Sequence, residues 1–127
     1  MLAVDTNVLV RLLVRDDAKQ AVAADQAVAK GAWVSHLVLA EAVWVLDAVY
    51  ARTPKQLIAA LDLLLVHESL VLQDADAVAA ALAQFRAKPA LGFSDCLVLE
   101  IARKAGHLPL ATFDKALARA AGAHRLL

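Results

Sequence analysis

The sequence predicts an α/β fold in which short parallel strands alternate with helices. Brief apolar runs recur along the chain, between longer segments whose apolar residues repeat at helical spacing. Glycine and proline occur singly or in pairs between these segments, and no linker rich in Gly, Ser or Pro interrupts the chain. Strands that alternate with helices usually pair in parallel, because each helix returns the chain to the same end of the sheet. We expect residues 1–127 to form a single domain.

The expected strands are the short apolar runs. The run at 2–4 ends at the polar Asp5, and the run at 32–34 follows a glycine. The remaining strands are expected at 70–72, at 108–112 and, as a last edge strand, at 124–127.

The expected helices carry recognisable start and stop signals. Thr53-Pro54 pairs an N-cap residue with a proline in the first turn. Asp16-Asp17 and Asp74 offer further N-caps, and Gly31 and Gly106 end helices. The helices are expected over 7–14, 17–30, 36–52, 54–67, 74–87, 94–105 and 113–121.

Composition and charge exclude several classes of protein. The chain has 13 Lys and Arg against 13 Asp and Glu, so it lacks the overall basic excess of many nucleic-acid-binding chains, although a local basic patch is compatible with this balance. Its longest unbroken apolar run, 77–83, is far shorter than the roughly 20 residues of a membrane-spanning helix. A hydrophobic fraction of 61% excludes intrinsic disorder. The lone Cys96 and a start without a basic signal-peptide segment lead us to expect a cytoplasmic protein.

Four acidic residues are expected at one edge of the sheet. Asp5 directly follows the first strand, Asp114 follows the fourth, Asp95 opens a helix, and Glu41 lies about two turns into the helix after the second strand. In an open parallel sheet, ligands bind beyond the carboxyl ends of the strands. Glu41 is also the only polar residue between 37 and 46, and an ionised carboxylate on an apolar stripe is costly unless it is paired or binds a metal.

The arrangement has a simpler interpretation, because aspartate at a helix start is commonly an N-cap and Glu41 could be paired with a basic side chain. Convergence at one edge would nevertheless leave like charges that repel unless a cation neutralises them. Oxygen ligands suit Mg²⁺ or Mn²⁺, and such a site hydrolyses phosphodiesters through a metal-bound water. Two alternatives remain open: a haloacid-dehalogenase-like phosphatase with Asp5 as nucleophile, and a non-catalytic binding scaffold. The first alternative is weakened by Asn7, which stands where that class usually places a second aspartate.

Four segments of the chain resemble, in order and spacing, the acidic motifs of PIN-domain ribonucleases, in particular the small VapC-type toxins of bacterial toxin–antitoxin pairs. These segments are DTNVLVR at 5–11, LAE at 39–41, FSDCLVLEIARKAG at 93–106 and TFDKAL at 112–117. The resemblance covers essentially the whole chain. It implies a PIN-like three-layer sandwich, with a central parallel sheet of about five short strands and helices on both faces.

The resemblance also implies an Mg²⁺- or Mn²⁺-dependent endoribonuclease. Polar residues that orient a carboxylate or a water would be Thr6 or Asn7, and Thr112, with Thr112 favoured over Thr6. The implied partners are the RNA substrate, a second copy of the chain and a cognate antitoxin that inserts near the acidic pocket, with DNA bound only indirectly through the antitoxin. The implied catalytic and metal-binding carboxylates are Asp5, Glu41, Asp95 and Asp114.

The remaining polar and aromatic residues are expected to have lesser roles. Three basic residues flank the acidic edge and are expected to contact the RNA backbone: Arg86, Lys88 and Lys115. Arg11 and Arg15 could contact phosphates, but a solvated position or pairing with Asp16 or Asp17 is favoured, and Glu100 is expected to be ordinary surface charge. We interpret Cys96 as a small buried residue, and Trp33 and Trp44 as core or dimer contacts, with the helices of 37–66 as the dimer interface.

Overall fold

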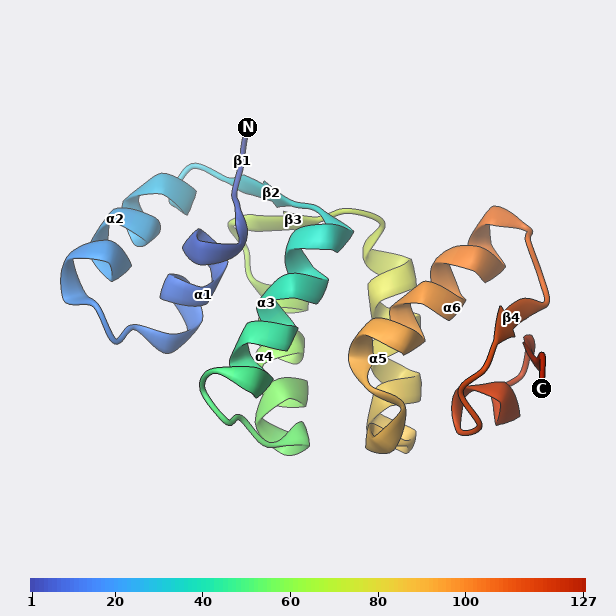
Figure 1. Cartoon of the computed structure of the whole chain (residues 1–127). Helices are drawn as coiled ribbons and strands as arrows, with labels where there is room; N and C mark the ends of the chain where they lie inside the picture. The colour runs from blue at the N-terminus through green and yellow to red at the C-terminus, as the bar shows by residue number, and fades with distance from the viewer. The chain divides into compact units, whose positions relative to one another are not determined.

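A computed structural model describes all 127 residues and confirms the α/β class. All five expected strands are present, every pairing is parallel, and the strands divide between two sheets (Figure 1). The first sheet has the order β1-β2-β3 and comprises β1 (Leu2–Ala3), β2 (Ala32–Val34) and β3 (Leu70–Leu72). The second pairs β4 (Leu110–Thr112) with β5 (Ala123–Arg125).

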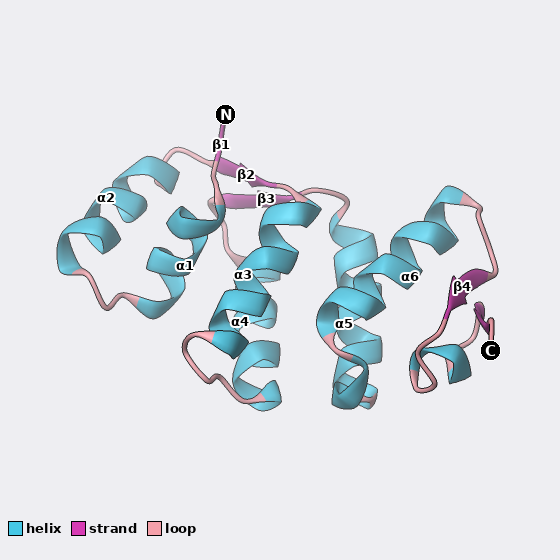
Figure 2. Ribbon diagram, viewed as in Figure 1, coloured by secondary structure: helices cyan, strands magenta, loops and turns pink.

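Six α-helices and two 3₁₀ turns connect the strands. Figure 2 colours the helices cyan and the strands magenta. The helices are α1 (Thr6–Val14), α2 (Ala18–Val28), α3 (His36–Ala48), α4 (Pro54–Val66), α5 (Ala75–Ala87) and α6 (Phe93–Ala105). The 3₁₀ turns are η1 (Pro89–Leu91) and η2 (Leu117–Arg119). None of the helices combines the length and the apolar character that crossing a membrane requires.

The helix boundaries follow the capping residues. Thr53 and Gln56 form a reciprocal capping box at the start of α4, with Pro54 in the first turn. The Asp17 side chain accepts a hydrogen bond from the Gln20 backbone N–H, 3.0 Å away, at the start of α2. Helix α6 ends at Gly106, whose φ of 83° lies in the left-handed region that glycine adopts without strain.

The segment at 113–121 differs from the expected helix. It contains only the single 3₁₀ turn η2, because the chain must return from Thr112 to pair Ala123 with Leu110 in parallel. That short connection leaves room for one turn, which the Asp114 side chain begins by accepting a hydrogen bond from the Leu117 backbone N–H at 2.8 Å.

The chain folds as two compact units, Met1–Ala75 and Asp76–Leu127, which we call the N-terminal and C-terminal units. In the N-terminal unit, α1 contacts α2 and α3, while α4 contacts α3 and β3. The alternate residues of β2 and β3 point to one face and are buried there, whereas Trp33 and Val71 occupy the other face and are 37% and 48% exposed. The fully buried side chains include Leu9, Leu39 and Leu61 in the N-terminal unit and Val78, Cys96 and Leu99 in the C-terminal unit.

Candidate active site

The N-terminal unit carries Asp5 and Glu41, and the residue after Asp5 is hydrogen-bonded to Glu41. Asp5 is the N-cap of α1, and its Oδ1 accepts a hydrogen bond from the Val8 backbone N–H at 3.2 Å. The next residue, Thr6, donates a hydrogen bond from Oγ1 to Glu41 Oε2 on α3 at 2.7 Å. The start of α1 therefore holds one carboxylate itself and orients a second one from a helix that is distant in the sequence.

The surroundings of Glu41 correct the sequence-based expectation of a charge on a buried stripe. Glu41 is exposed, and so are Leu37 and Trp44, which lie four residues before it and three after it on the same helical face. The buried face of α3 carries other residues, such as Leu39 and Val43. Glu41 is thus a solvated carboxylate with one hydrogen-bond donor, and Trp44, at 63% exposure, is not a core residue.

The C-terminal unit carries the second carboxylate pair, Asp95 and Asp114. Asp95 lies in the first turn of α6, and Asp114 follows β4. Burial is the main cause that raises the pKa of Asp95 above its ordinary value, and the negative charge of Asp114 raises it further. The two carboxylates are therefore close enough to repel each other.

Two threonines support the carboxylates in different ways. Thr112 was the favoured orienting residue, and its Oγ1 accepts a hydrogen bond from the Asp114 backbone N–H at 3.0 Å, so it holds the main chain of Asp114. Thr6, the less favoured of the two threonines, donates directly to the carboxylate of Glu41. The signal available in the sequence was the position of Thr6 in the first helical turn, directly after Asp5.

The donor chemistry fits a hard divalent cation. Each unit offers two of the four candidate carboxylates. Neither unit contains a group of three or more His, Cys, Asp or Glu side chains placed to hold a metal ion. Carboxylate oxygens without sulfur or imidazole partners favour Mg²⁺ or Mn²⁺ over Zn²⁺. Burial first and the charge of Asp114 second raise the pKa of Asp95, and a cation bound there would offset both.

The three basic residues expected to contact RNA are all exposed in the C-terminal unit. Arg86 lies in the last turn of α5, Lys88 precedes η1, and Lys115 directly follows Asp114. Their exposure is compatible with phosphate contacts, and their role stays a prediction.

Glu100 was expected to be surface charge, and this expectation is wrong. Glu100 is only 8% exposed; it accepts hydrogen bonds from Gln84 Nε2 on α5 and from Arg103 Nε, the latter at 3.2 Å. Its spacing from Cys96 and Leu97, four and three residues earlier, places it on the buried face of α6, and this spacing was readable in the sequence. The carboxylate is structural, since both of its oxygens are satisfied within the C-terminal unit.

Cys96 is buried, as expected, and burial together with the charges of Asp95 and Glu100 raises the pKa of its thiol to about 11. A thiol that stays protonated is a poor nucleophile, so the site offers no cysteine chemistry. The pairing of Arg15 also differs from expectation, since it binds Asp25 through both terminal nitrogens rather than Asp16 or Asp17.

Comparison with known proteins bears on the whole chain. The PIN-domain family profile matches residues 2–123, a span that contains both carboxylate pairs. Searches of curated proteins and of solved structures returned no match.

Proposed function

The chain belongs to the PIN-domain family, and from that premise we propose that it is an Mg²⁺- or Mn²⁺-dependent endoribonuclease. PIN domains are typically metal-dependent nucleases, which favours this activity over a phosphatase with Asp5 as nucleophile. The observation that carries the proposal is that each unit has a pair of carboxylates next to the carboxyl end of a strand. Asp5 and Asp114 follow β1 and β4, and each is accompanied by a second carboxylate, Glu41 or Asp95.

The proposed roles follow from the contacts of each side chain. We assign cation binding to Asp5, Glu41, Asp95 and Asp114. The bound cation supplies a water of lowered pKa as the attacking group, so no protein nucleophile is required. Thr6 keeps Glu41 in one orientation, and Thr112 fixes the main chain at Asp114. A bound cation would favour the ionised form of Asp95, against the burial and the charge of Asp114 that raise the pKa of this carboxyl.

The test is cleavage of total cellular RNA by purified protein in Mg²⁺, in Mn²⁺ and in EDTA. We expect cleavage only with a divalent cation, and a loss of at least about 100-fold in Asp5→Asn, because one metal ligand loses its charge. Asp17→Asn is the matched control, since Asp17 caps α2 as Asp5 caps α1 and asparagine is an equally good N-cap.

An equal loss in both variants would show that the loss in Asp5→Asn does not come from a missing metal ligand. Absence of cleavage under every metal, together with absence of Mn²⁺ binding at millimolar concentration, would favour a non-catalytic scaffold. An aspartyl-phosphate trapped on Asp5 would support the phosphatase instead.

We also propose that the nuclease is the toxin of a toxin–antitoxin pair, that it acts as a homodimer, and that it meets DNA only through its antitoxin. The support is the VapC-like order of the acidic motifs and the apolar residues exposed on α3 and α4, among them Leu37, Trp44 and Val66. Production in a bacterial host tests the toxin role. The wild-type chain should arrest growth, Asp5→Asn should not, and the product of a small adjacent reading frame should relieve the arrest.

A further inference from the structure

We propose that Arg11 binds a backbone phosphate of the RNA substrate, in a groove between α1 and α2 that also contains Asp5. The inference rests on the proposed function, because it takes the cleavage site to lie at Asp5. It adds a binding residue and a direction in which the RNA runs over the N-terminal unit. The pairing of Arg11 with Asp16, which the sequence suggested, describes only part of what this side chain does.

The groove is formed by one face of each helix. Helix α2 contributes small side chains, which leave an open hollow of about 500 Å³ between the two helices. Polar groups are found on both sides of it, and all of them belong to the N-terminal unit. The lining residues are Asp5, Asn7, Val8 and Arg11 from α1 and its cap, and Gln20, Ala23, Ala24 and Ala27 from α2.

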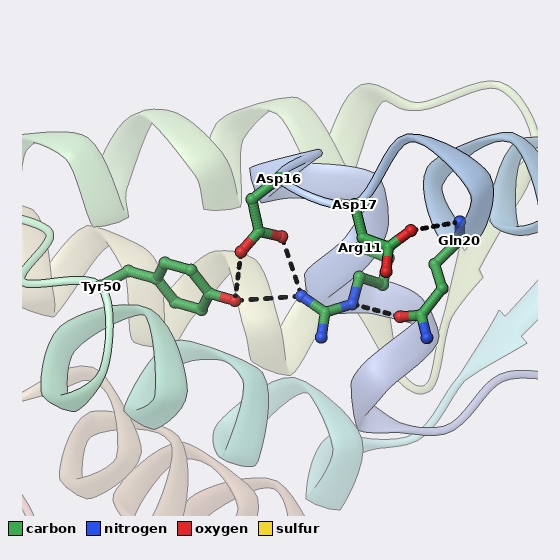
Figure 3. A network of polar contacts seen from close by, with 5 residues as sticks. All are labelled: Arg11, Asp16, Asp17, Gln20 and Tyr50. Carbon is green, nitrogen blue, oxygen red and sulfur yellow. Dashed lines mark hydrogen bonds and ion pairs between the residues drawn. The ribbon is translucent and has the colours of Figure 1, made fainter.

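The guanidinium of Arg11 is held in place from three directions (Figure 3). Its Nε donates to Gln20 Oε1 at 2.6 Å, and its Nη1 donates to Asp16 Oδ1 at 2.8 Å and to Tyr50 Oη at 3.0 Å. Tyr50 in turn donates to Asp16 Oδ2 at 3.1 Å. Nη2 takes no part in this network, as Figure 3 shows, so a fixed planar cation keeps one donor group available.

Such a group is suited to a phosphate. Arginine binds phosphate oxygens through its planar array of donors, and a side chain that is already ordered loses little entropy on binding. The side chain of Arg11 is 26% exposed, so a ligand in the groove can reach it.

The separation of Arg11 from Asp5 fits a strand of RNA. Six residues of helix rise by about 9 Å, and a stacked nucleic-acid strand rises by about 3.4 Å per nucleotide. A phosphate at Arg11 therefore belongs to a nucleotide two or three positions away from the cleaved one.

Arg15 provides an internal comparison. It is the C-cap residue of α1, four residues after Arg11, and it also pairs with an aspartate, but both of its terminal nitrogens bind Asp25, at 2.8 and 2.7 Å. Arg15 does not line the groove. The two arginines thus match in charge and both belong to the C-terminal part of α1 and its cap, and they differ in the feature that the proposal uses.

The first experiment compares Arg11→Gln with Arg15→Gln in RNA cleavage and in RNA binding. We expect Arg11→Gln to raise KM about tenfold with kcat nearly unchanged, and Arg11→Lys to recover part of the loss. The slope of log Kd against log salt should fall by about 0.7 in Arg11→Gln, as for one lost contact to a single strand. Arg15→Gln should change KM less than twofold.

The second experiment removes the opposing charge. Asp16→Asn should tighten RNA binding about threefold, because the charge of Arg11 is then less neutralised, whereas Asp25→Asn should leave affinity unchanged. Misfolding cannot produce a gain in affinity, so this pair keeps the test decisive even if Arg11→Gln is unstable.

The outcomes separate this inference from the proposed function. If the wild-type protein cleaves RNA but the two arginine substitutions have equal effects on KM and on the salt slope, the role of Arg11 is overturned and the proposed function stands. If the wild-type protein does not cleave RNA, the proposed function fails, and binding of uncut single-stranded RNA in EDTA still tests Arg11. A weaker Asp16→Asn complex would show that Arg11 serves only the folded structure.

Discussion

At the scale of a single residue, the ionisation of Asp95 affects both the stability of the fold and the binding of a cation. A carboxyl whose pKa is raised in the folded state holds its proton more tightly there than in the unfolded chain. Its contribution to stability is therefore fully present below its unfolded pKa, near the ordinary 3.8, and is lost as pH rises through the folded pKa. At neutral pH without metal, ionised Asp95 opposes folding.

We predict that Asp95→Asn raises the melting temperature by a few degrees in EDTA at pH 7, while it abolishes cleavage. The difference from wild type should shrink as the pH is lowered, because protonated Asp95 is as neutral as asparagine. Mg²⁺ or Mn²⁺ should stabilise the wild type and not the variant. Asp76→Asn, at an exposed first-turn aspartate of α5, is the control and should not show this rise. The prediction is contradicted if, in EDTA, the wild type melts at the same temperature as Asp95→Asn or at a higher one.

The hydrogen bond from Thr6 to Glu41 leads to a second prediction at this scale. Thr6→Val keeps the shape of the side chain and removes the donor, so Glu41 samples more orientations. Residues that orient metal ligands usually contribute about 10-fold to 100-fold in metal affinity or activity. We expect at least a tenfold loss in Mn²⁺ affinity by calorimetry or in kcat, and recovery in Thr6→Ser. Unchanged values in Thr6→Val would mean that Glu41 is positioned by other contacts.

At the scale of elements, Arg103 joins α6 to two other segments of the C-terminal unit. Its Nε donates to Glu100, which also accepts from Gln84 on α5, and its Nη2 donates to the Ala121 carbonyl oxygen at 2.6 Å. Removing a partner from a mostly buried carboxylate costs more than the pair itself contributes. We predict that Arg103→Ala lowers the free energy of unfolding by about 1–3 kcal/mol, measured with urea. Adding Glu100→Gln should restore part of the loss, and strictly additive effects would contradict the coupling.

The sequence predicted the bounds of those helices whose ends depend on contacts between residues close together in the chain. The capping box at Thr53 begins α4, and the glycine at 106 ends α6. Both act through short-range contacts, so these helix bounds could be predicted. The short turn at 113–121 depends on the pairing of β5 with β4, which is a long-range constraint that helical spacing does not reveal.

The candidate site was also predicted only in part. The residue types and order of the four carboxylates could be predicted from the sequence, but the exposure of Glu41 could not. Its apolar neighbours suggested a buried stripe, whereas Leu37 and Trp44 are exposed with it. The sequence shows how apolar one face of a helix is. Whether other elements cover that face depends on the folded chain.

At the scale of the whole molecule, the exposed apolar residues on α3 and α4 bear on the proposed homodimer. Leu37 and Trp44 on α3 are 69% and 63% exposed, and Leu63 and Val66 on α4 are 57% and 79% exposed. The two helices contact each other, so these side chains belong to one pair of adjacent elements. Large apolar side chains exposed on two adjacent helices are more typical of an interface than of a surface that remains in water.

We predict that the double variant Trp44→Gln/Val66→Lys weakens the dimer at least about tenfold, because it removes an aromatic contact and introduces a charge at the interface. Lysine at the last residue of α4 is favourable to the helix itself, so the variant should remain folded. Light scattering after size exclusion, over a range of micromolar concentrations, measures the change. Val22→Lys, at a 52% exposed valine on α2, is the control and should remain dimeric. A dimer that survives the double substitution would place the interface elsewhere, and a wild-type chain that is monomeric throughout this range would refute the homodimer.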